Sequence, residues 1–213
     1  LGGAGDSRRP TVALTFDDGY AGMFHHVLPL LEEHRVPATF FVTSVRATGQ
    51  EMLWTDALDI AARWTTGPLT LDGEVFNRSR KGLVSRRRGD RLAARARGMT
   101  PTELARLVDQ LRTGPLANHD LDRLWEYWRP LDTDELQQLA TCPYVTLGAH
   151  GTTHADLATQ TPEVVRDELA TGQHWLESTT GRRVDLLAWP FGRATREGVE
   201  VARRLGFRYQ LLG

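Results

Sequence analysis

Two histidines four residues apart and a pair of adjacent aspartates are the residues whose types and spacing could do chemistry. His150 and His154 stand in the run His-Gly-Thr-Thr-His, and on one helical turn such a pair presents both imidazoles on the same side. Asp17 and Asp18 are adjacent, so one carboxylate could bind a cation while the other stays free as a base. Two histidines and one carboxylate suit Zn²⁺, Co²⁺ or Ni²⁺. Taken separately, the patterns also fit unrelated surface histidines and an ordinary Asp-Asp-Gly turn.

Each of these groups stands at the end of an expected strand. The strands are β-branched and apolar runs, and three of them end on unusual residues: 11–16 before Asp17-Asp18, 144–149 before His150, and 184–189 before Pro190-Phe191-Gly192. Sites in α/β folds collect at the carboxyl ends of parallel strands. We therefore expect the three ends to converge in space.

The elements between these strands predict an α/β fold with a long insertion. A helix over 21–34, interrupted near Pro29, and a strand over 38–43 complete a parallel βαβ unit with the first strand. Near the end of the chain, the alternation continues with helices over 162–178 and 196–205 and a strand over 207–212. Between them, a mostly helical block interrupts the alternation, with helices expected at 52–64, 101–111, 121–128 and 133–140. We expect a single domain, residues 1–213, with this insertion at about 44–143.

Composition narrows the classes of function. The formal net charge is −1, which predicts no nucleic-acid partner, and no apolar run reaches the ~20 residues of a transmembrane segment. Cys142 is the only cysteine, so a metal site must use histidine and carboxylate ligands. The chain starts at Leu1 without a signal-peptide pattern, so we expect a cytoplasmic protein, or a secreted one if a signal peptide was removed.

Together, the motifs resemble one family. Thr-Phe-Asp-Asp-Gly-Tyr at 15–20, His-Gly-Thr-Thr-His at 150–154 and Trp-Pro-Phe-Gly at 189–192 resemble, in the same order, the first three motifs of the polysaccharide deacetylases (NodB-homology, carbohydrate esterase 4). Val-Pro-Ala-Thr-Phe-Phe-Val at 36–42 is similar to the second strand of that family. The resemblance covers roughly 11–43 and 144–213. It implies a distorted (β/α) barrel of NodB-homology type, incomplete at the C-terminus.

The resemblance also implies roles for single residues. Asp17 would be the general base, and the metal ligands would be Asp18, His150 and His154. The backbone N–H of Phe191 would stabilise the oxyanion. The residues expected to contact the substrate, an N-acylated sugar, are Tyr20, Trp189, Pro190, Phe191 and Arg193. For Trp189, core packing is an equally good interpretation.

Two departures from the family pattern leave gaps in this site. Ala188 stands where many members carry an arginine that orients the base, so Asp17 would need another partner, for which we name Arg193. The Leu-x-His motif that supplies the general acid in the family does not occur before Gly213. The acid would then lie on a missing C-terminal part or be another residue; His25, His26 and His174 remain, each expected on a helix surface.

Several functions share this chemistry. The leading hypothesis is N-deacetylation of an amino sugar in a glycan, glycolipid or glycosylated small molecule, with Zn²⁺ as the expected metal. Deformylation, O-acetyl ester hydrolysis, and hydrolysis of cyclic imides or ureides need the same metal and base. A sugar-binding module without turnover is the alternative from another class. The arginine-dense stretch Arg78–Arg97 fits either a solvated loop or a contact with an anionic part of the substrate, such as a phosphate or uronate.

Overall fold

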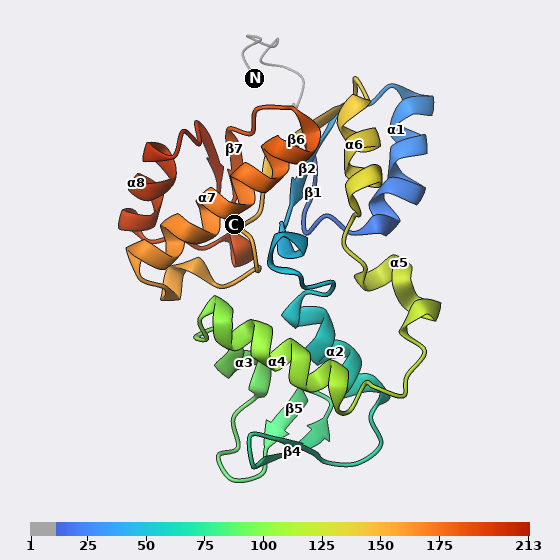
Figure 1. Ribbon diagram of the computed structural model, residues 1–213, viewed down its shortest axis with the longest axis vertical. Helices are drawn as coiled ribbons and strands as arrows, with labels where there is room; N and C mark the ends of the chain where they lie inside the picture. Colours follow the sequence, from blue (N-terminus) through green and yellow to red (C-terminus); the bar gives the residue numbers. More distant parts are fainter. Residues whose placement is uncertain (1–11) are drawn as a thin grey trace.

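The core of the protein is a curled sheet of five parallel strands. The computed structural model describes residues 12–213 (Figure 1), so Thr11, the first residue of the first expected strand, lies outside the described part. The strand order is β1-β2-β6-β7-β8, with β1 at Leu14–Phe16, β2 at Ala38–Val42, β6 at Val145–Ala149, β7 at Leu186–Ala188 and β8 at Tyr209–Leu211. This curled parallel sheet with surrounding helices confirms the predicted α/β class and the distorted-barrel type.

The predicted βαβ unit forms at the start of the chain. β1 and β2 pair in parallel with Phe16 opposite Phe40, and the two rings stack with centroids 5.0 Å apart. The connecting helix has two parts, a π-helical turn η1 (Met23–Val27) and α1 (Leu28–His34), so the interruption expected near Pro29 falls just before it. Leu28 and Leu31, three residues apart, are buried, whereas Leu30 is 54% exposed, because only positions three or four apart share a helix face.

Three longer helices cover the sheet. They are α6 (Thr133–Thr141), α7 (Pro162–Thr180) and α8 (Arg196–Arg204), and Figure 1 shows α6 beside α1, with α7 and α8 around the other half of the sheet. α7 ends, as predicted, at Gly181, whose φ of 66° closes the helix in the left-handed conformation. Two short 3₁₀ turns, η4 (Leu157–Thr159) and η5 (Pro190–Gly192), lie in the loops that follow β6 and β7.

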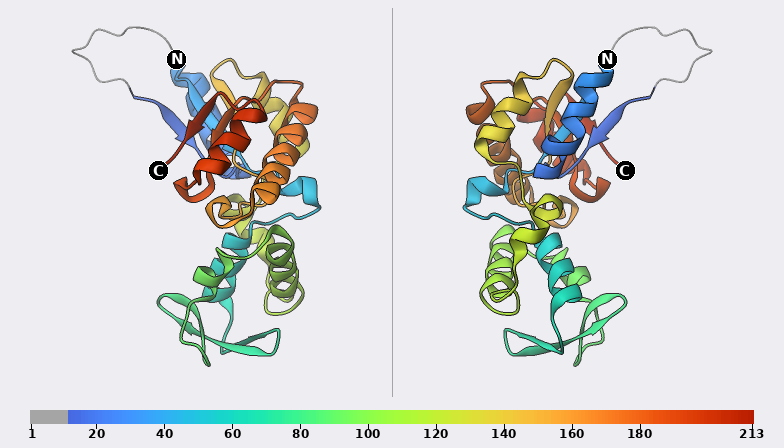
Figure 2. Two further views of the ribbon diagram at one scale, coloured as in Figure 1. Left: turned by 90° about the vertical axis from the view of Figure 1, so that its left-hand side faces the viewer. Right: turned by 90° about the vertical axis from the view of Figure 1, so that its right-hand side faces the viewer.

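The insertion forms a second lobe below the sheet (Figures 1 and 2). Its helical segments are η2 (Val45–Thr48), α2 (Trp54–Trp64), α3 (Leu92–Ala96), α4 (Pro101–Thr113), η3 (Leu121–Leu124) and α5 (Trp125–Trp128). Three of the four expected helical segments lie in this lobe, whereas the fourth, 133–140, is α6 and packs against β6 of the sheet. Thr100 and Glu103 form a capping box at the start of α4. The sequence did not predict the antiparallel sheet β3-β4-β5, made of Leu69–Leu71, Glu74–Ser79 and Gly82–Ser85.

Among residues 12–213, no helix combines the length and the apolar character needed to cross a lipid bilayer.

Candidate metal centre and active site

The ends of neighbouring strands hold Asp18 and His150 close together. β2 pairs with both β1 and β6, so the carboxyl ends of all three strands lie at one edge of the sheet. The hydroxyl of Thr43, the residue after β2, donates a 2.6 Å hydrogen bond to the backbone carbonyl of Asp18. On the other side of β2, the backbone N–H of His150 donates to the carbonyl of Val42 over 3.0 Å. The predicted convergence of strand ends is therefore present.

A tight turn separates the two aspartates. Asp18 has a φ of 72°, and the N–H of Gly19 reaches back to the carbonyl of Asp17 over 2.9 Å. A Cβ on Gly19 would lie 2.7 Å from a methyl group of Val42, so only glycine lets the turn approach β2 this closely. The side chain of Asp18 is partly buried, whereas Asp17 is exposed. The two carboxylates therefore occupy different environments, as separate roles in catalysis require.

A backbone carbonyl fixes the tautomer of His150. Its Nδ1 lies 2.8 Å from the carbonyl oxygen of Ala188, at the end of β7, and only a protonated Nδ1 can donate to that oxygen. The lone pair of Nε2 is then free on the side that faces Asp18. Ala188, the position where the family resemblance led us to look for an arginine, thus contributes through its main chain to the orientation of a metal ligand.

His154 lies in an irregular loop, not on the helical turn that its spacing suggested. Gly151 and His154 have φ values of 75° and 58°, and left-handed residues at both positions prevent a helix from forming. The loop nevertheless brings the two imidazole rings to a centroid distance of 5.0 Å. The indole N–H of Trp54, the first residue of α2, donates a 2.9 Å hydrogen bond to the backbone carbonyl of His154.

A buried glutamate on α7 holds the same loop. One carboxylate oxygen of Glu168 accepts the backbone N–H groups of Thr152 and Thr153 over 3.1 and 2.9 Å, and the other accepts the Thr153 hydroxyl over 3.0 Å. One turn further along α7, a Cβ at Gly172 would lie 3.1 Å from the carbonyl oxygen of Gly151, so glycine permits the close approach of helix and loop. The position of His154 is therefore set from two sides, by α7 and by α2.

The three predicted ligands meet with the geometry of a metal site. Nε2 of His150 and Nε2 of His154 lie 3.5 and 3.2 Å from the same oxygen, Oδ1 of Asp18. That oxygen is buried and has no hydrogen-bond partner among the described residues. Ligands about 2.1 Å from a tetrahedral Zn²⁺ lie about 3.4 Å from one another, which agrees with both distances. The three side chains could therefore hold a divalent cation without rearrangement.

Burial sets the protonation states at this site. Burial, followed by the charges of His150 and Arg97, lowers the pKa of His154 to about 3, so the ring is neutral at pH 7, as a metal ligand must be. Burial also raises the pKa of the Asp18 carboxyl above its usual range; His150 opposes this effect and Asp17 adds to it. A bound cation would favour the ionised carboxylate and offset the cost of burying it.

Tyr20 and Asp56 form a buried acidic pair beside Asp18. The Tyr20 hydroxyl donates to the Asp56 carboxylate over 3.0 Å. Burial, followed by the charges of Asp56 and Asp18, holds the pKa of Tyr20 above its usual range. Burial also raises the pKa of Asp56 to about 7; the Tyr20 hydrogen bond lowers it, while the charge of Asp18 raises it. Tyr20, expected to contact the substrate, is therefore tied to α2 of the insertion.

The third motif divides into one residue at the site and two in the core. Phe191 packs against His154 with ring centroids 4.7 Å apart and has a φ of 59°. Its N–H lies in the first turn of η5, where a helix leaves its donors without an intrahelical acceptor. Trp189, expected to line the sugar groove, is only 1% exposed, and its indole N–H donates to Gln210 over 3.1 Å, so it belongs to the core. Pro190 is buried as well and cannot contact substrate in this structure.

Arg193 does not hold the proposed base. Its guanidinium donates to the carboxylate of Asp156 over 3.0 Å, and Asp156 is almost fully buried, so the arginine serves to neutralise this acid. Within the described part of the chain, no side chain forms a hydrogen bond or an ion pair with the Asp17 carboxylate. The suggestion that Arg193 replaces the arginine absent at Ala188 is therefore wrong for this structure.

The three histidines that we considered as the general acid are placed elsewhere. His25 lies 2.8 Å from Glu135, His26 lies 3.4 Å from Glu126, and His174 is exposed on α7. Between residues 12 and 213, no hydrogen bond or ring contact joins any of them to the metal triad. None of them stands out as the general acid.

Sequence reasoning did not identify three residues that support the site: Trp54, Asp56 and Glu168. Glu168 had a detectable signal, because it lies three residues after Val165 and one before Leu169, on the buried face of α7 where an unpaired charge is costly. Trp54 and Asp56 had no detectable signal in the sequence, because only the folding of the insertion back onto the sheet brings them to the strand ends.

The sequence of residues 4–72 and 100–210 matches the family described as polysaccharide deacetylase. The chain belongs to the polysaccharide deacetylase family. The match is wider than the resemblance we noted, because it includes much of the insertion; the segment 73–99, with β4, β5 and α3, lies outside it. No curated protein sequence matches the chain significantly.

Solved structures of the same family share the fold at low sequence identity. The BpsB deacetylase domain from Bordetella bronchiseptica is 20% identical with a TM-score of 0.52, and the match covers 94% of this chain and 63% of that one. The deacetylase PplD from Streptococcus pyogenes, solved with acetate, is 14% identical with a TM-score of 0.52, and the match covers 92% of this chain and 53% of that one. A carbohydrate esterase family 4 pseudoenzyme from Bacillus anthracis is 14% identical with a TM-score of 0.51, and the match covers 96% of this chain and 43% of that one. The chain thus spans less than two thirds of the length of each of these structures.

Proposed function

We propose that this protein is a metal-dependent hydrolase that removes the N-acetyl group from an amino sugar in a glycan, glycolipid or glycosylated small molecule. The observation that carries the proposal is the buried, unpartnered Oδ1 of Asp18, with Nε2 of His150 and Nε2 of His154 at 3.5 and 3.2 Å. Membership of the polysaccharide deacetylase family supports the reaction class.

Each residue has a defined task in this proposal. A divalent ion held by Asp18, His150 and His154, with Zn²⁺ preferred and Co²⁺ or Ni²⁺ possible by the same donors, would polarise the acyl carbonyl and acidify a water molecule. Asp17 accepts the proton of the attacking water, which its exposed carboxylate can reach from the solvent side. The N–H of Phe191 donates to the oxygen on which negative charge develops.

The acetyl group is not the only acyl group that this machinery fits. A formyl amide or an O-acetyl ester presents the same carbonyl to the same donors, so the triad does not distinguish among the three substrates. The distinction would come from the groove around Phe191 and Trp54, which form one edge of the site with ring centroids 6.0 Å apart.

A sugar-binding module without turnover is the second candidate, and one observation favours it. Asp17 lacks a hydrogen-bond or ion-pair partner within the described residues, and Ala188 offers no side chain to orient it. One of the structural neighbours is, by its own description, a pseudoenzyme. In a binding module, the metal would still be held and the sugar would still bind, without hydrolysis.

Acetate release tests the two candidates against each other. The purified protein, loaded with Zn²⁺ or Co²⁺, is incubated with N-acetylglucosamine oligomers, and free acetate is measured against Asp17→Asn as the matched variant. A deacetylase releases acetate, and Asp17→Asn lowers the rate by about 10²–10⁴-fold while it retains the metal. A protein that binds metal and sugar but releases no acyl group from acetylated, formylated or O-acetylated sugars is the binding module.

A further inference from the structure

A groove of about 400 Å³ opens next to the candidate metal centre. One wall comes from α2, with Trp54 and Leu58, and the lining includes Phe191, whose ring packs against His154. The other wall comes from the segment 73–99, which lies outside the family match. The basic residues that line the groove are Arg80, Lys81, Arg91 and Arg97.

The segment 73–99 carries an unusual concentration of positive charge. It contains nine basic and two acidic residues, a net charge of +7 in a chain whose total is −1. The two acids are already occupied, because Glu74 pairs with Arg95 over 2.6 Å and Asp90 pairs with Arg95 over 2.7 Å. Within the described residues, none of the four cations that line the groove has an ion-pair partner. Most of the segment's charge is therefore available to a ligand.

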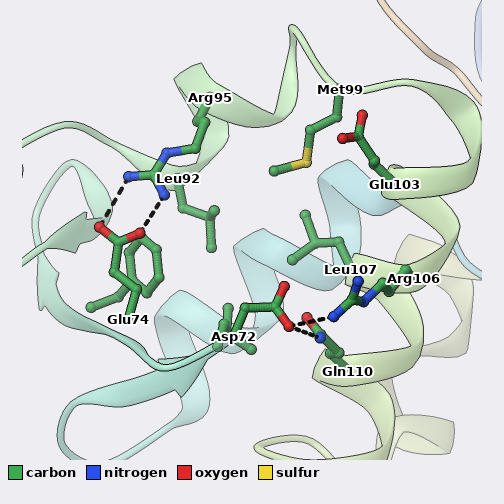
Figure 3. A pocket seen from close by; sticks show the side chains of 11 residues that line it. Asp72, Glu74, Leu92, Arg95, Met99, Glu103, Arg106, Leu107 and Gln110 are labelled. Atoms are coloured by element: carbon green, nitrogen blue, oxygen red, sulfur yellow. Dashed lines mark hydrogen bonds and ion pairs between the residues drawn. The ribbon is translucent and has the colours of Figure 1, made fainter.

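A second cavity beside the same segment has charged side chains that pair with one another, unlike the cations of the groove. This cavity of about 180 Å³ lies between the segment and α4, and Figure 3 shows Arg95 joined to Glu74 and Arg106 joined to Asp72. Arg106 and Gln110 of α4 both donate to Asp72 over 2.7 Å, and Arg95 holds Glu74. The Arg95–Glu74 pair joins α3 to β4 within the segment, and the two contacts to Asp72 hold the residue directly before the segment to α4. The cations of the groove lie outside this network and are not needed to hold the segment in place.

The groove and the metal centre are close enough to act on one substrate. The guanidinium of Arg97 lies over the Phe191 ring at 4.5 Å, and the other neighbour of that ring, His154, lies at 4.7 Å. Arg97 and His154 are therefore within about 9 Å of each other, roughly one Debye length at physiological ionic strength. The only acid that lines the groove, Asp59, already pairs with Arg63 over 2.8 Å. An anion in the groove would meet cations without a competing carboxylate.

We propose that this groove binds an anionic group, a phosphate or a carboxylate, carried on the acylated sugar or on the unit next to it. The inference rests on the proposed function and refines it: the substrate is a negatively charged amino-sugar compound. Arg80, Lys81 and Arg91 attract and hold the charge, while Arg97 places it beside Phe191. The partly exposed ring of Phe191 offers an aromatic face for the sugar ring between the two sites.

Two charge-matched triple variants test the proposal. The first, Arg80→Gln/Lys81→Gln/Arg91→Gln, removes three cations that line the groove and keeps Arg97 because it touches Phe191. The second, Arg78→Gln/Arg86→Gln/Arg87→Gln, removes the same charge from exposed positions of the same segment that do not line the groove. The substrates are chitotetraose, which is neutral, a hyaluronan tetrasaccharide, which adds carboxylates, and N-acetylglucosamine 6-phosphate, which adds a phosphate.

The ratio of kcat/KM for an anionic substrate to that for chitotetraose is the deciding quantity. We expect the groove variant to lower this ratio on the order of tenfold at low salt, and the control variant to leave it unchanged. The comparison of the hyaluronan tetrasaccharide with N-acetylglucosamine 6-phosphate shows whether the groove binds a carboxylate or a phosphate. Equal ratios in the wild type and in both variants overturn the inference and leave the deacetylase assignment intact.

A binding measurement separates failure of the inference from failure of the proposed function. Titration of the metal-loaded protein with N-acetylglucosamine 6-phosphate and with the hyaluronan tetrasaccharide gives affinities that do not depend on turnover. Affinity for at least one of them should fall on the order of tenfold in the groove variant and not in the control. If no acyl group is ever released, the proposed function fails, and these affinities alone decide whether the groove is an anion site.

Discussion

The indole N–H of Trp54 donates a 2.9 Å hydrogen bond to the backbone carbonyl of His154. Trp54 begins α2 in the insertion, whereas His154 belongs to the loop after β6, one hundred residues further along the chain. Both groups are buried, so the carbonyl has little access to water as a substitute donor. The insertion therefore takes part in positioning a proposed metal ligand.

Trp54→Phe removes this donor while keeping most of the apolar volume. A buried carbonyl left without its partner costs about 1–3 kcal/mol, and we expect the free energy of unfolding to fall by that amount. Zn²⁺ affinity should fall as well, by about tenfold, because the His154 loop loses one of its two supports. Denaturant unfolding and competition for Zn²⁺ with a chelator measure the two effects.

Trp128→Phe is the matched control for that variant. Trp128 is also buried and donates to a backbone carbonyl, that of Leu121, over 3.0 Å, but it contacts no member of the triad within the described residues. It should lose a similar amount of stability and keep the wild-type Zn²⁺ affinity. An equal loss of affinity in both variants would mean that Trp54 acts only through global stability.

Asp18→Ala or His154→Ala should abolish binding of the metal, because each provides one of three converging donors. At a Zn²⁺ concentration about one hundred times its Kd, the wild type gains about 2.7 kcal/mol, which raises Tm by about 5–11 °C. Neither alanine variant should show this rise, whereas Asp17→Asn should show it in full. Differential scanning fluorimetry with and without Zn²⁺ measures it, and an undiminished rise in Asp18→Ala contradicts the ligand assignment.

Glu168→Leu should loosen the His154 loop from the other side. It leaves two buried backbone N–H groups, those of Thr152 and Thr153, without an acceptor, at about 1–3 kcal/mol each. Glu168→Gln is the informative partner, because its amide oxygen can still accept both N–H groups and its NH₂ can donate to the Thr153 hydroxyl. We expect the Zn²⁺ affinity of Glu168→Leu to be about 10–100-fold below that of the wild type, and the affinity of Glu168→Gln to be near that of the wild type. Equal affinities in the two variants would show that the carboxylate does not act through the loop.

The parts of this site that follow strands could be predicted from the sequence. Apolar runs identify strands, and parallel strands bring their ends to one edge, so Asp18 and His150 needed only the order of the elements to be placed together. The helices of the insertion were visible for the same local reason, as in the capping box of Thr100 and Glu103. Local signals of this kind do not depend on how distant segments meet.

Features set by long-range packing could not be predicted. The second half of β4, Asn77–Ser79, is polar and exposed and runs into Arg80 and Lys81, so the sequence indicated a charged loop there instead of a strand. The left-handed conformation of His154 depends on the support of Glu168 and Trp54, which nothing in the spacing of the histidines reveals. Trp189 lies in the core, where its ring packs closely against α8 at Gly198; a Cβ at that glycine would lie 3.2 Å from the ring. An aromatic residue that is near a site in the sequence therefore need not face the site.

Asp56→Asn tests the electrostatics of the buried pair with Tyr20. Burial raises the pKa of Asp56 from 3.8 to about 7, so the folded state binds this proton more tightly than the unfolded chain. A carboxyl shifted upwards contributes stability at low pH that is lost as the pH rises between these two values. His154, whose pKa is lowered from 6.5 to about 3, acts in the opposite direction, so the wild-type curve alone does not isolate either group.

The comparison of variant and wild type isolates Asp56. Asparagine keeps an oxygen that can accept the Tyr20 hydroxyl and carries no charge at any pH. In the presence of a chelator, the stability of Asp56→Asn relative to the wild type should therefore increase as the pH rises from 3.8 to about 7, the interval in which the wild-type carboxyl is forced to ionise. Urea unfolding at several pH values gives the two curves. Asp134→Asn, at an exposed position of α6, is the control, and parallel curves for Asp56→Asn and the wild type would show that the Asp56 carboxyl is not perturbed.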